Sequence, residues 1–341
     1  MKPERFAAAT IAALLTVTAC AENPVGPPGS SGYEANAVSS DRGGGSPYTF
    51  STLDVPGATQ TIPSGINAGG RVVGWYTQGG VTRGFVYEDG VFTTNIVYPG
   101  AAFTQLRGVS PSGEIAGTYR NAGETGPAFH GFVLTTDGTF LEARFPNHAN
   151  NITQRIMPDG TLLGCFHDGD TMASMHGATI SRMAYAPNSP TVSDDGYSSI
   201  DNFASMTNGG TPDGHTFTGL FVDMDANLGR AFVINDGEFT PFDAPGSDFT
   251  AAEDMNPGRT IVGLFESAGT SNIHGFILDQ WRVAAGALSG TFTTIDFPLT
   301  PSTIAAYTDV FGINPRGDVV GKYKETATGS FHGYIATRKT E

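Results

Sequence analysis

Short runs of β-branched and aromatic residues, broken by clusters of Gly, Asn, Asp and Pro, recur along the chain from Tyr48 onwards. The first copy contains four such runs: one that ends at Asn67, followed by 71–76, 84–87 and 91–94. Residues that tolerate positive φ separate the runs, so the pattern predicts two β-hairpins in each copy. Two hairpins give four antiparallel strands per copy. No window of this region shows the period of a helix.

The copies can be aligned on a Gly that usually follows an aliphatic pair. These residues are Gly74, Gly117, Gly164, Gly219, Gly263 and Gly321. The shortest separation is 43 residues, from Gly74 to Gly117, and the longest is 58 residues, from Gly263 to Gly321. A period of about 40–50 residues is typical of a four-stranded propeller blade and is too long for one turn of a parallel β-helix. The sequence therefore predicts an all-β fold, a six-bladed β-propeller with four-stranded antiparallel blades.

The phase of the repeat predicts how the two ends of the chain meet. Residues 48–56 match 292–298, which form the last strand of a copy, whereas the chain ends on 333–336, the third strand of a copy. We expect the N-terminal strand to lie beside 333–336 and to complete the last blade. Such pairing closes the ring and hides sheet edges that would recruit other chains.

The repeat has a recognisable motif. Its clearest copy is GINPRGDVVGKY at 312–323, followed by His-Gly-Tyr at 332–334 and preceded by FTTIDFP at 292–298. Over 48–337 the chain resembles the HAF family of bacterial extracellular repeat proteins. The resemblance weakens in the third and fourth copies, where Gly-Ile-Asn is replaced around 155–157 and 209–211. It implies secretion and repeated strands, and it implies no established activity or ligand.

The first 20 residues have the composition of a bacterial secretion signal. Lys2 and Arg5 precede an apolar stretch at 6–15, which is too short to span a bilayer, and 17–20 end in Cys20 as a lipobox does. We therefore expect lipidation of Cys20 and attachment to the cell envelope, at the outer membrane or the cell surface. The alternative is ordinary cleavage after the A-x-A pattern at 19–21, which would release a secreted protein.

Composition divides the remaining chain in two. Residues 21–46 are rich in Gly, Ser and Pro and predict a disordered linker, while 47–338 form the propeller domain.

The net charge of −15 excludes a nucleic-acid partner, and we expect a monomer that contacts the membrane only through its lipid. After Cys20 only Cys165 remains, so no intramolecular disulfide can form, and its place beside the repeat Gly predicts a buried, inert thiol.

The residue directly before the Gly-Phe or Gly-Tyr pair, or before its nearest equivalent, is an Arg or a His in every copy. The six are Arg83, His130, His176, Arg230, His274 and His332. Ring symmetry would place them at one radius, where they could line a site for an anionic ligand. In the alternative, structural interpretation each donates a hydrogen bond to the backbone or to a nearby acid, for which Asp54, Asp201, Asp243 and Asp296 are candidates. A feature present in every blade favours the structural interpretation.

A loop in the fourth copy is a candidate calcium site. Asp223, Asp225 and Asn227 alternate along the chain, as the oxygen ligands of a hard cation do. The loop Gly comes one place late and no Glu follows at the usual distance, so a polar hairpin loop is the favoured interpretation. The run His-Asp-Gly-Asp at 167–170 is a weaker version of the same pattern.

Motifs of known enzyme classes are missing from the sequence. No G-x-S-x-G, H-E-x-x-H or P-loop pattern occurs in the mature chain. We therefore expect an envelope-anchored binding or interaction module for a protein, glycan or small-molecule partner, bound at one mouth of the ring. The alternative is a metal-dependent hydrolase or lyase at the central channel, and a purely structural surface protein is a third possibility. An enzyme should bring non-repeated His, Asp or Glu residues together at one mouth.

Overall fold

The structure is a computed structural model that describes residues 46–124, 128–145, 148, 150–168, 174–185, 197–199, 204–223, 226, 228–300, 302–327 and 329–339. The predicted signal peptide with Cys20, the linker up to residue 45, Asp201, Asp225 and Asn227 lie outside the described residues. Strands dominate, and one short helix, α1 (Arg182–Tyr185), occurs. In the described part of the chain, no helix has the length and apolar character needed to cross a membrane.

Four sheets of the described residues each contain four consecutive antiparallel strands. The first comprises β2 (Gln60–Ile66), β3 (Val72–Gln78), β4 (Val81–Glu88) and β5 (Val91–Ile96). The second comprises β6 (Ala101–Val109), β7 (Ile115–Asn121), β8 (His130–Leu134) and β9 (Phe140–Glu142). The third comprises β10 (Asn150–Ile156), β11 (Leu162–His167), β12 (Met175–Ile180) and β13 (Tyr197–Ser199). The fourth comprises β14 (Ala204–Gly210), β15 (Thr216–Asp223), β16 (Leu228–Asn235) and β17 (Glu238–Phe242).

An eight-stranded sheet holds the remaining long strands, and it consists of two groups of four. One group is β18 (Ser247–Met255), β19 (Ile261–Ser267), β20 (Ile273–Ala284) and β21 (Ala287–Ile295). The other is β24 (Tyr307–Ile313), β25 (Val319–Lys324), β26 (His332–Arg338) and β1 (Tyr48–Thr52). A single parallel pair, Ile273 opposite Tyr307, joins the two groups. A small hairpin of β22 (Pro298–Thr300) and β23 (Thr303–Ile304) lies between them in the sequence.

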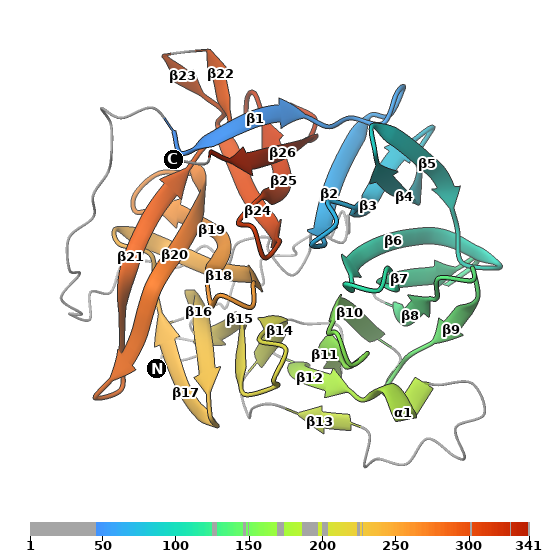
Figure 1. Ribbon diagram of the computed structural model, residues 1–341, viewed down its shortest axis with the longest axis horizontal. Coiled ribbons are helices and arrows are strands. Elements are labelled where there is room, and N and C mark those ends of the chain that lie inside the picture. Colours follow the sequence, from blue (N-terminus) through green and yellow to red (C-terminus); the bar gives the residue numbers. More distant parts are fainter. Residues whose placement is uncertain are drawn as a thin grey trace, which may run out of the picture.

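The groups surround a common axis, which gives a β-propeller fold (Figure 1). The first strand of each group lies closest to the axis: β2, β6, β10, β14, β18 and β24. Apolar side chains fill the space between neighbouring groups. One such cluster joins Val73 of β3 to Leu106 of β6 and Phe132 of β8, all of them fully buried. The innermost strands are therefore buried along most of their length, as in β2, whereas an outermost strand such as β5 alternates between exposed and half-buried residues.

β1 pairs with β26, so the first strand of the described chain lies beside the last (Figure 1). The pairing is antiparallel and runs from Tyr48 opposite Arg338 to Thr52 opposite Tyr334. The phenol of Tyr48 donates a hydrogen bond of 3.1 Å to the carbonyl of Gly317. The ring of Phe50 packs 5.7 Å from that of Tyr334, measured between centroids. This is the place that the phase of the repeat predicts for the N-terminal strand.

Every innermost strand contains a β-bulge, at which the register with the second strand shifts. The bulged residues are Ser64, Arg107, Gln154, Asn208, Glu253 and Phe311. The next residue is Gly in four groups, because neighbouring innermost strands approach closely there: a Cβ on Gly65 would lie 2.9 Å from the carbonyl oxygen of Arg107. The third and fifth groups carry Arg155 and Asp254 at this position instead.

The Asn of the Gly-Ile-Asn motif stabilises the turn and joins adjacent groups. The side-chain oxygen of Asn67 accepts hydrogen bonds from the backbone N–H groups of Gly69 and Arg71, at 3.0 and 3.1 Å. Its amide nitrogen donates to the carbonyl of Ser110 in the next group, at 3.3 Å. Asn256 donates in the same way to Asn314, at 3.2 Å. Asn67 and Asn256 therefore each support their own turn and the neighbouring one, whereas Asn314 donates to Asp318 within its own turn, at 2.9 Å.

Candidate functional site

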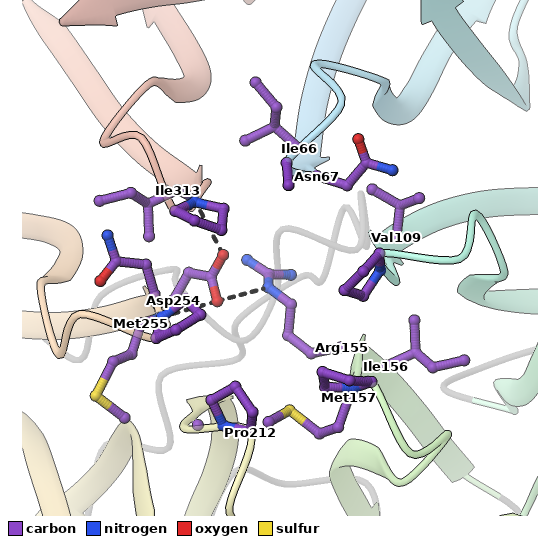
Figure 2. A pocket seen from close by; sticks show the side chains of 17 residues that line it. Ile66, Asn67, Val109, Arg155, Ile156, Met157, Pro212, Asp254, Met255 and Ile313 are labelled. Atoms are coloured by element: carbon purple, nitrogen blue, oxygen red, sulfur yellow. Dashed lines mark hydrogen bonds and ion pairs between the residues drawn. The ribbon is translucent and has the colours of Figure 1, made fainter.

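The turns that follow the innermost strands meet around the axis and line a pocket of about 100 Å³ (Figure 2). All six groups contribute equivalent positions to it. The walls are mainly the apolar residues at the ends of these strands: Ile66, Val109, Ile156, Met255 and Ile313. The rim is a ring of turn residues, which are Ala68, Pro111, Pro158, Pro212, Pro257 and Pro315. Pockets for drug-sized ligands have volumes of about 300–1,000 Å³, so this one accommodates a short group rather than a whole molecule of that size.

The charged residues that line the pocket are Arg155 and Asp254, which face each other across the axis (Figure 2). Nε of Arg155 lies 3.2 Å from Oδ1 of Asp254, and each residue is 9% exposed. The carboxylate also accepts hydrogen bonds from the backbone N–H groups of Met255 at 2.9 Å and Ile313 at 3.1 Å. Burial raises the pKa of Asp254, while Arg155 and these two hydrogen bonds oppose the rise.

Arg155 joins four of the groups through backbone carbonyls. Its Nη1 donates to the carbonyls of Gln154 at 2.9 Å and Arg107 at 3.3 Å. Its Nη2 donates to the carbonyls of Glu253 at 3.0 Å and Phe311. These four acceptors are all bulged residues. A guanidinium has five N–H groups, and here the four on Nη1 and Nη2 meet carbonyls, while Nε forms the ion pair with Asp254 without a hydrogen bond. Arg155 therefore forms the floor of the pocket, and the donors of its two terminal nitrogens are already bound to the protein.

The six basic residues identified from the sequence lie on the third strand of their groups, away from the pocket. Each is directly opposite an aromatic residue of the second strand, as His274 is opposite Phe265. The six pairs are Tyr76–Arg83, Tyr119–His130, Phe166–His176, Phe221–Arg230, Phe265–His274 and Tyr323–His332. None of the six lines the pocket. The repeat thus places them at equivalent positions, but two strands away from the axis.

Acidic side chains lie close to five of these basic residues. Those described are His332 with Asp54 at 2.8 Å, Arg230 with Asp243 at 2.7 Å, His274 with Asp296 at 2.9 Å, His130 with Glu124 at 2.9 Å and His176 with Asp168 at 3.0 Å. Three of the acids, Asp54, Asp243 and Asp296, are those that the structural interpretation names. Each contact joins the third strand of a group to an acid outside that strand.

The candidate calcium loop is described only in part. Asp223 accepts a hydrogen bond from the backbone N–H of Ala226 at 3.0 Å and pairs with Nη1 of Arg230 at 3.3 Å. Its predicted partners Asp225 and Asn227 lie outside the described residues. Among the residues that the structure does describe, no three His, Cys, Asp or Glu side chains are grouped so that they could hold a metal ion. The weaker run at 167–170 contributes Asp168, which contacts His148 and His176. Cys165 is buried and not part of a disulfide, and its Sγ lies 3.6 Å from Nε2 of His167.

Sequence analysis did not identify the pocket or its floor. The available signal was the loss of the repeat Gly at Arg155 and Asp254. At Arg155 the loss by itself indicates only a weak copy of the motif. In four other copies this position is Gly, because the neighbouring strand leaves little room for a side chain. A large charged residue at the same position therefore indicates a specific contact.

Comparison with known proteins bears on the fold. No protein-family model matches the chain, and no curated protein sequence matches it. TolB from Acinetobacter baumannii is 13% identical with a TM-score of 0.44, over 79% of this chain and 64% of that one, which is less than two thirds of its length. A gluconolactonase from Xanthomonas campestris is 14% identical with a TM-score of 0.47, over 86% and 90% of the two chains. The β-propeller domain of the Trilobed protease from Pyrococcus furiosus is 12% identical with a TM-score of 0.42, over 83% and 98%.

Proposed function

We propose that the protein is a binding module and that its ligand-binding site is the pocket at the mouth of the axis. The proposal takes the strand groups as the six blades of one ring, with β1 as the fourth strand of the last blade. The observation that carries it is the convergence of equivalent turns from all six repeats on a single apolar pocket. A concave apolar site with a few fixed polar groups is the usual form of a ligand site.

The walls and the floor define the ligand by its chemistry. The walls are aliphatic, and the polar atoms of Arg155 already have protein partners, so the group that enters should be apolar and short. A branched aliphatic or small aromatic side chain of a partner fits this description. Burying such a side chain contributes about 1.5–3 kcal/mol, which is less than the 4.1 kcal/mol of a millimolar complex. The rest of the partner must therefore contact the rim.

We further propose that the module is attached to the bacterial envelope through lipidated Cys20. The support is the order of charged, apolar and small residues before that cysteine. Mass spectrometry of the mature N-terminus tests this part separately, because it detects acyl chains on Cys20 whether or not the pocket binds anything. A mature chain that begins at another residue without acyl chains would contradict the anchor and leave the pocket untouched.

The competing proposal is a metal-dependent hydrolase or lyase at the central channel, and one observation is in its favour. Glu253, Asp254 and Asp309 occur near the axis and are not repeated in the other groups. However, all three are at most 9% exposed, and Glu253 and Asp309 do not line the pocket. A substrate in the pocket would therefore meet the already paired Asp254, which makes the binding function the better supported of the two.

Ligand-observed NMR with short apolar probes tests the binding site. The probes are isobutanol, isobutyramide and phenylacetamide, and the expected result is saturation transfer from the protein to at least one of them. Ala68→Trp places a large ring on the rim and should abolish the transfer. Val91→Trp is the matched control, because Val91 is 65% exposed on the outer strand β5. Equal transfer in both variants, or none in the unmodified protein at probe concentrations of roughly 10–100 mM, where such weak complexes are populated, would refute the site.

A further inference from the structure

Beneath the pocket floor, four charged side chains are buried close to the axis. We call Arg107, Glu253, Asp309 and Lys322 the axial cluster. They come from β6, β18, β24 and β25, and they are 4%, 5%, 0% and 1% exposed. None of them is repeated in the other copies: the positions equivalent to Lys322 are Trp75, Thr118, Cys165, Leu220 and Leu264. Charged residues are almost never buried to this extent unless they have partners.

The cations of the axial cluster have well-defined surroundings. Nζ of Lys322 lies 4.4 Å from the ring centroid of Phe331 and 4.9 Å from that of Phe311. The guanidinium of Arg107 lies 4.7 Å over the ring of Trp75 and donates to Oε1 of Gln105 at 2.6 Å. Aromatic faces at these distances stabilise a positive charge.

The carboxylate of Asp309 has fewer partners than these cations. Asp309 is fully buried, and neither of its side-chain oxygens has a hydrogen-bond partner among the described residues. Its nearest cation is Lys322, at 3.7 Å, which is longer than a hydrogen bond. An ionised carboxylate can accept about four hydrogen bonds, and leaving it without any in the interior is costly. Asp309 therefore needs donors beyond those that the described residues supply.

We propose that Glu253 and Asp309 form a buried site on the ring axis that binds ordered water together with one exchangeable proton. Glu253 lies on the innermost strand β18 and Asp309 on the next innermost strand, β24. Water supplies the donors that the oxygens of Asp309 lack, and a proton removes one of two like charges that share a desolvated space. This site is separate from the pocket and does not depend on what the pocket binds.

The titration of the two acids agrees with this geometry. Burial raises the pKa of Glu253 from its ordinary 4.5 to about 8, and the charge of Asp309 adds to the rise, whereas Arg155, Lys322 and Arg107 oppose it. Burial raises the pKa of Asp309 to about 6, and Lys322 opposes that rise. Tyr334, whose hydroxyl donates to the main-chain carbonyl of Asp309, stays neutral because burial raises its pKa further. Both pKa values are thus raised, which favours a site that keeps a proton at a pH where ordinary carboxyl groups have lost theirs.

The linked change in stability has a definite sign. Glu253 binds its proton more tightly in the folded protein than in the unfolded chain, so its contribution is fully present below about pH 4.5. That contribution is lost as the pH rises towards 8. The melting temperature should therefore fall between pH 5 and pH 9. The proton on Glu253 is also linked to the pocket floor, because the main-chain carbonyl of Glu253 accepts a hydrogen bond from Arg155.

Carboxyl ¹³C NMR of the unmodified protein tests the proton directly. The expected result is one Glu carboxyl signal that still titrates above pH 6, and Glu253→Gln should remove it. That variant should also lose most of the fall in melting temperature between pH 5 and pH 9. Glu238→Gln, at an exposed position on β17, is the matched control and should keep both. If every carboxyl titrates below pH 5, or if Glu253→Gln keeps the slope, the proton site is refuted. A high-resolution crystal structure without water at the Asp309 oxygens would refute the hydration.

Discussion

Replacing Arg155 by Ala should cause one of the largest losses of stability available from a single side chain in this protein. The change removes four hydrogen bonds to backbone carbonyls and leaves the carboxylate of Asp254 without its cation. Removing one partner of a buried ion pair costs about 3–5 kcal/mol. The orphaned carbonyls lie beside the pocket, where water can reach some of them, so we add no separate cost for each. In a domain of this size the loss corresponds to about 6–15 °C in melting temperature.

Chemical unfolding measures this loss. Fluorescence of Trp75 and Trp281 reports on the first and fifth strand groups, and the unfolding free energy follows from the midpoint and slope. Arg316→Ala is the matched control, because Arg316 also bridges two turns but its side chain is 56% exposed, so its loss should be below about 1 kcal/mol. A loss for Arg155→Ala no larger than that of the control would refute the role of Arg155 as the common partner of the bulge carbonyls.

Two extensions of this experiment distinguish the ion pair from the carbonyl contacts. The double variant Arg155→Ala, Asp254→Gly also removes the isolated carboxylate, so it should be less destabilised than the sum of the two single changes. Millimolar methylguanidinium should raise the melting temperature of Arg155→Ala but leave the unmodified protein unchanged, because the carbonyls and Asp254 then bind the free cation. Failure of both extensions would assign the loss to the cavity alone.

Three further predictions follow from other parts of the molecule. Deleting β1 should expose the edge of β26 and produce dimers or aggregates, which size-exclusion chromatography with light scattering detects; a stable monomer would contradict the pairing as the end of the ring. His274→Ala should lower stability by about 1–2 kcal/mol through its contact with Asp296, and unchanged melting with lost ligand capture would instead support the anion-binding interpretation. Calcium should leave the melting temperature unchanged, because Asp223 is already paired; a rise that Asp225→Ala abolishes would establish the loop as a calcium site.

The sequence was sufficient to locate strands and turns, because both depend on local chemistry. The run 71–76 became β3, Asp89 and Gly90 form the turn between β4 and β5 with positive φ, and β1 lies beside β26. The strand and the turn depend on alternation and on turn residues within a few positions. The pairing of β1 with β26 depends also on the phase of the repeat, which can be read from the sequence.

The candidate site was less accessible to sequence analysis, because it depends on which strand of each group lies at the axis. The six basic residues do occupy equivalent register positions, but strands lie about 4.8 Å apart, so a third strand is about 10 Å from the innermost one. Arg155, in contrast, lies at the axis because its strand is first in its group. Apart from Gln154, its hydrogen-bond partners are 48 to 156 residues away in the sequence, and no local sequence pattern predicts contacts between such distant residues.

The contact between β1 and β26 also has a consequence for how the protein is made. β1 leaves the ribosome before all the other described strands, whereas its partner β26 is the last of them. The earliest described strand therefore remains unpaired until β26 has been synthesised, while the intervening hairpins can form as they emerge. A prematurely terminated chain would expose this strand, and such an edge is a recognisable mark of an unfinished product for chaperones and proteases.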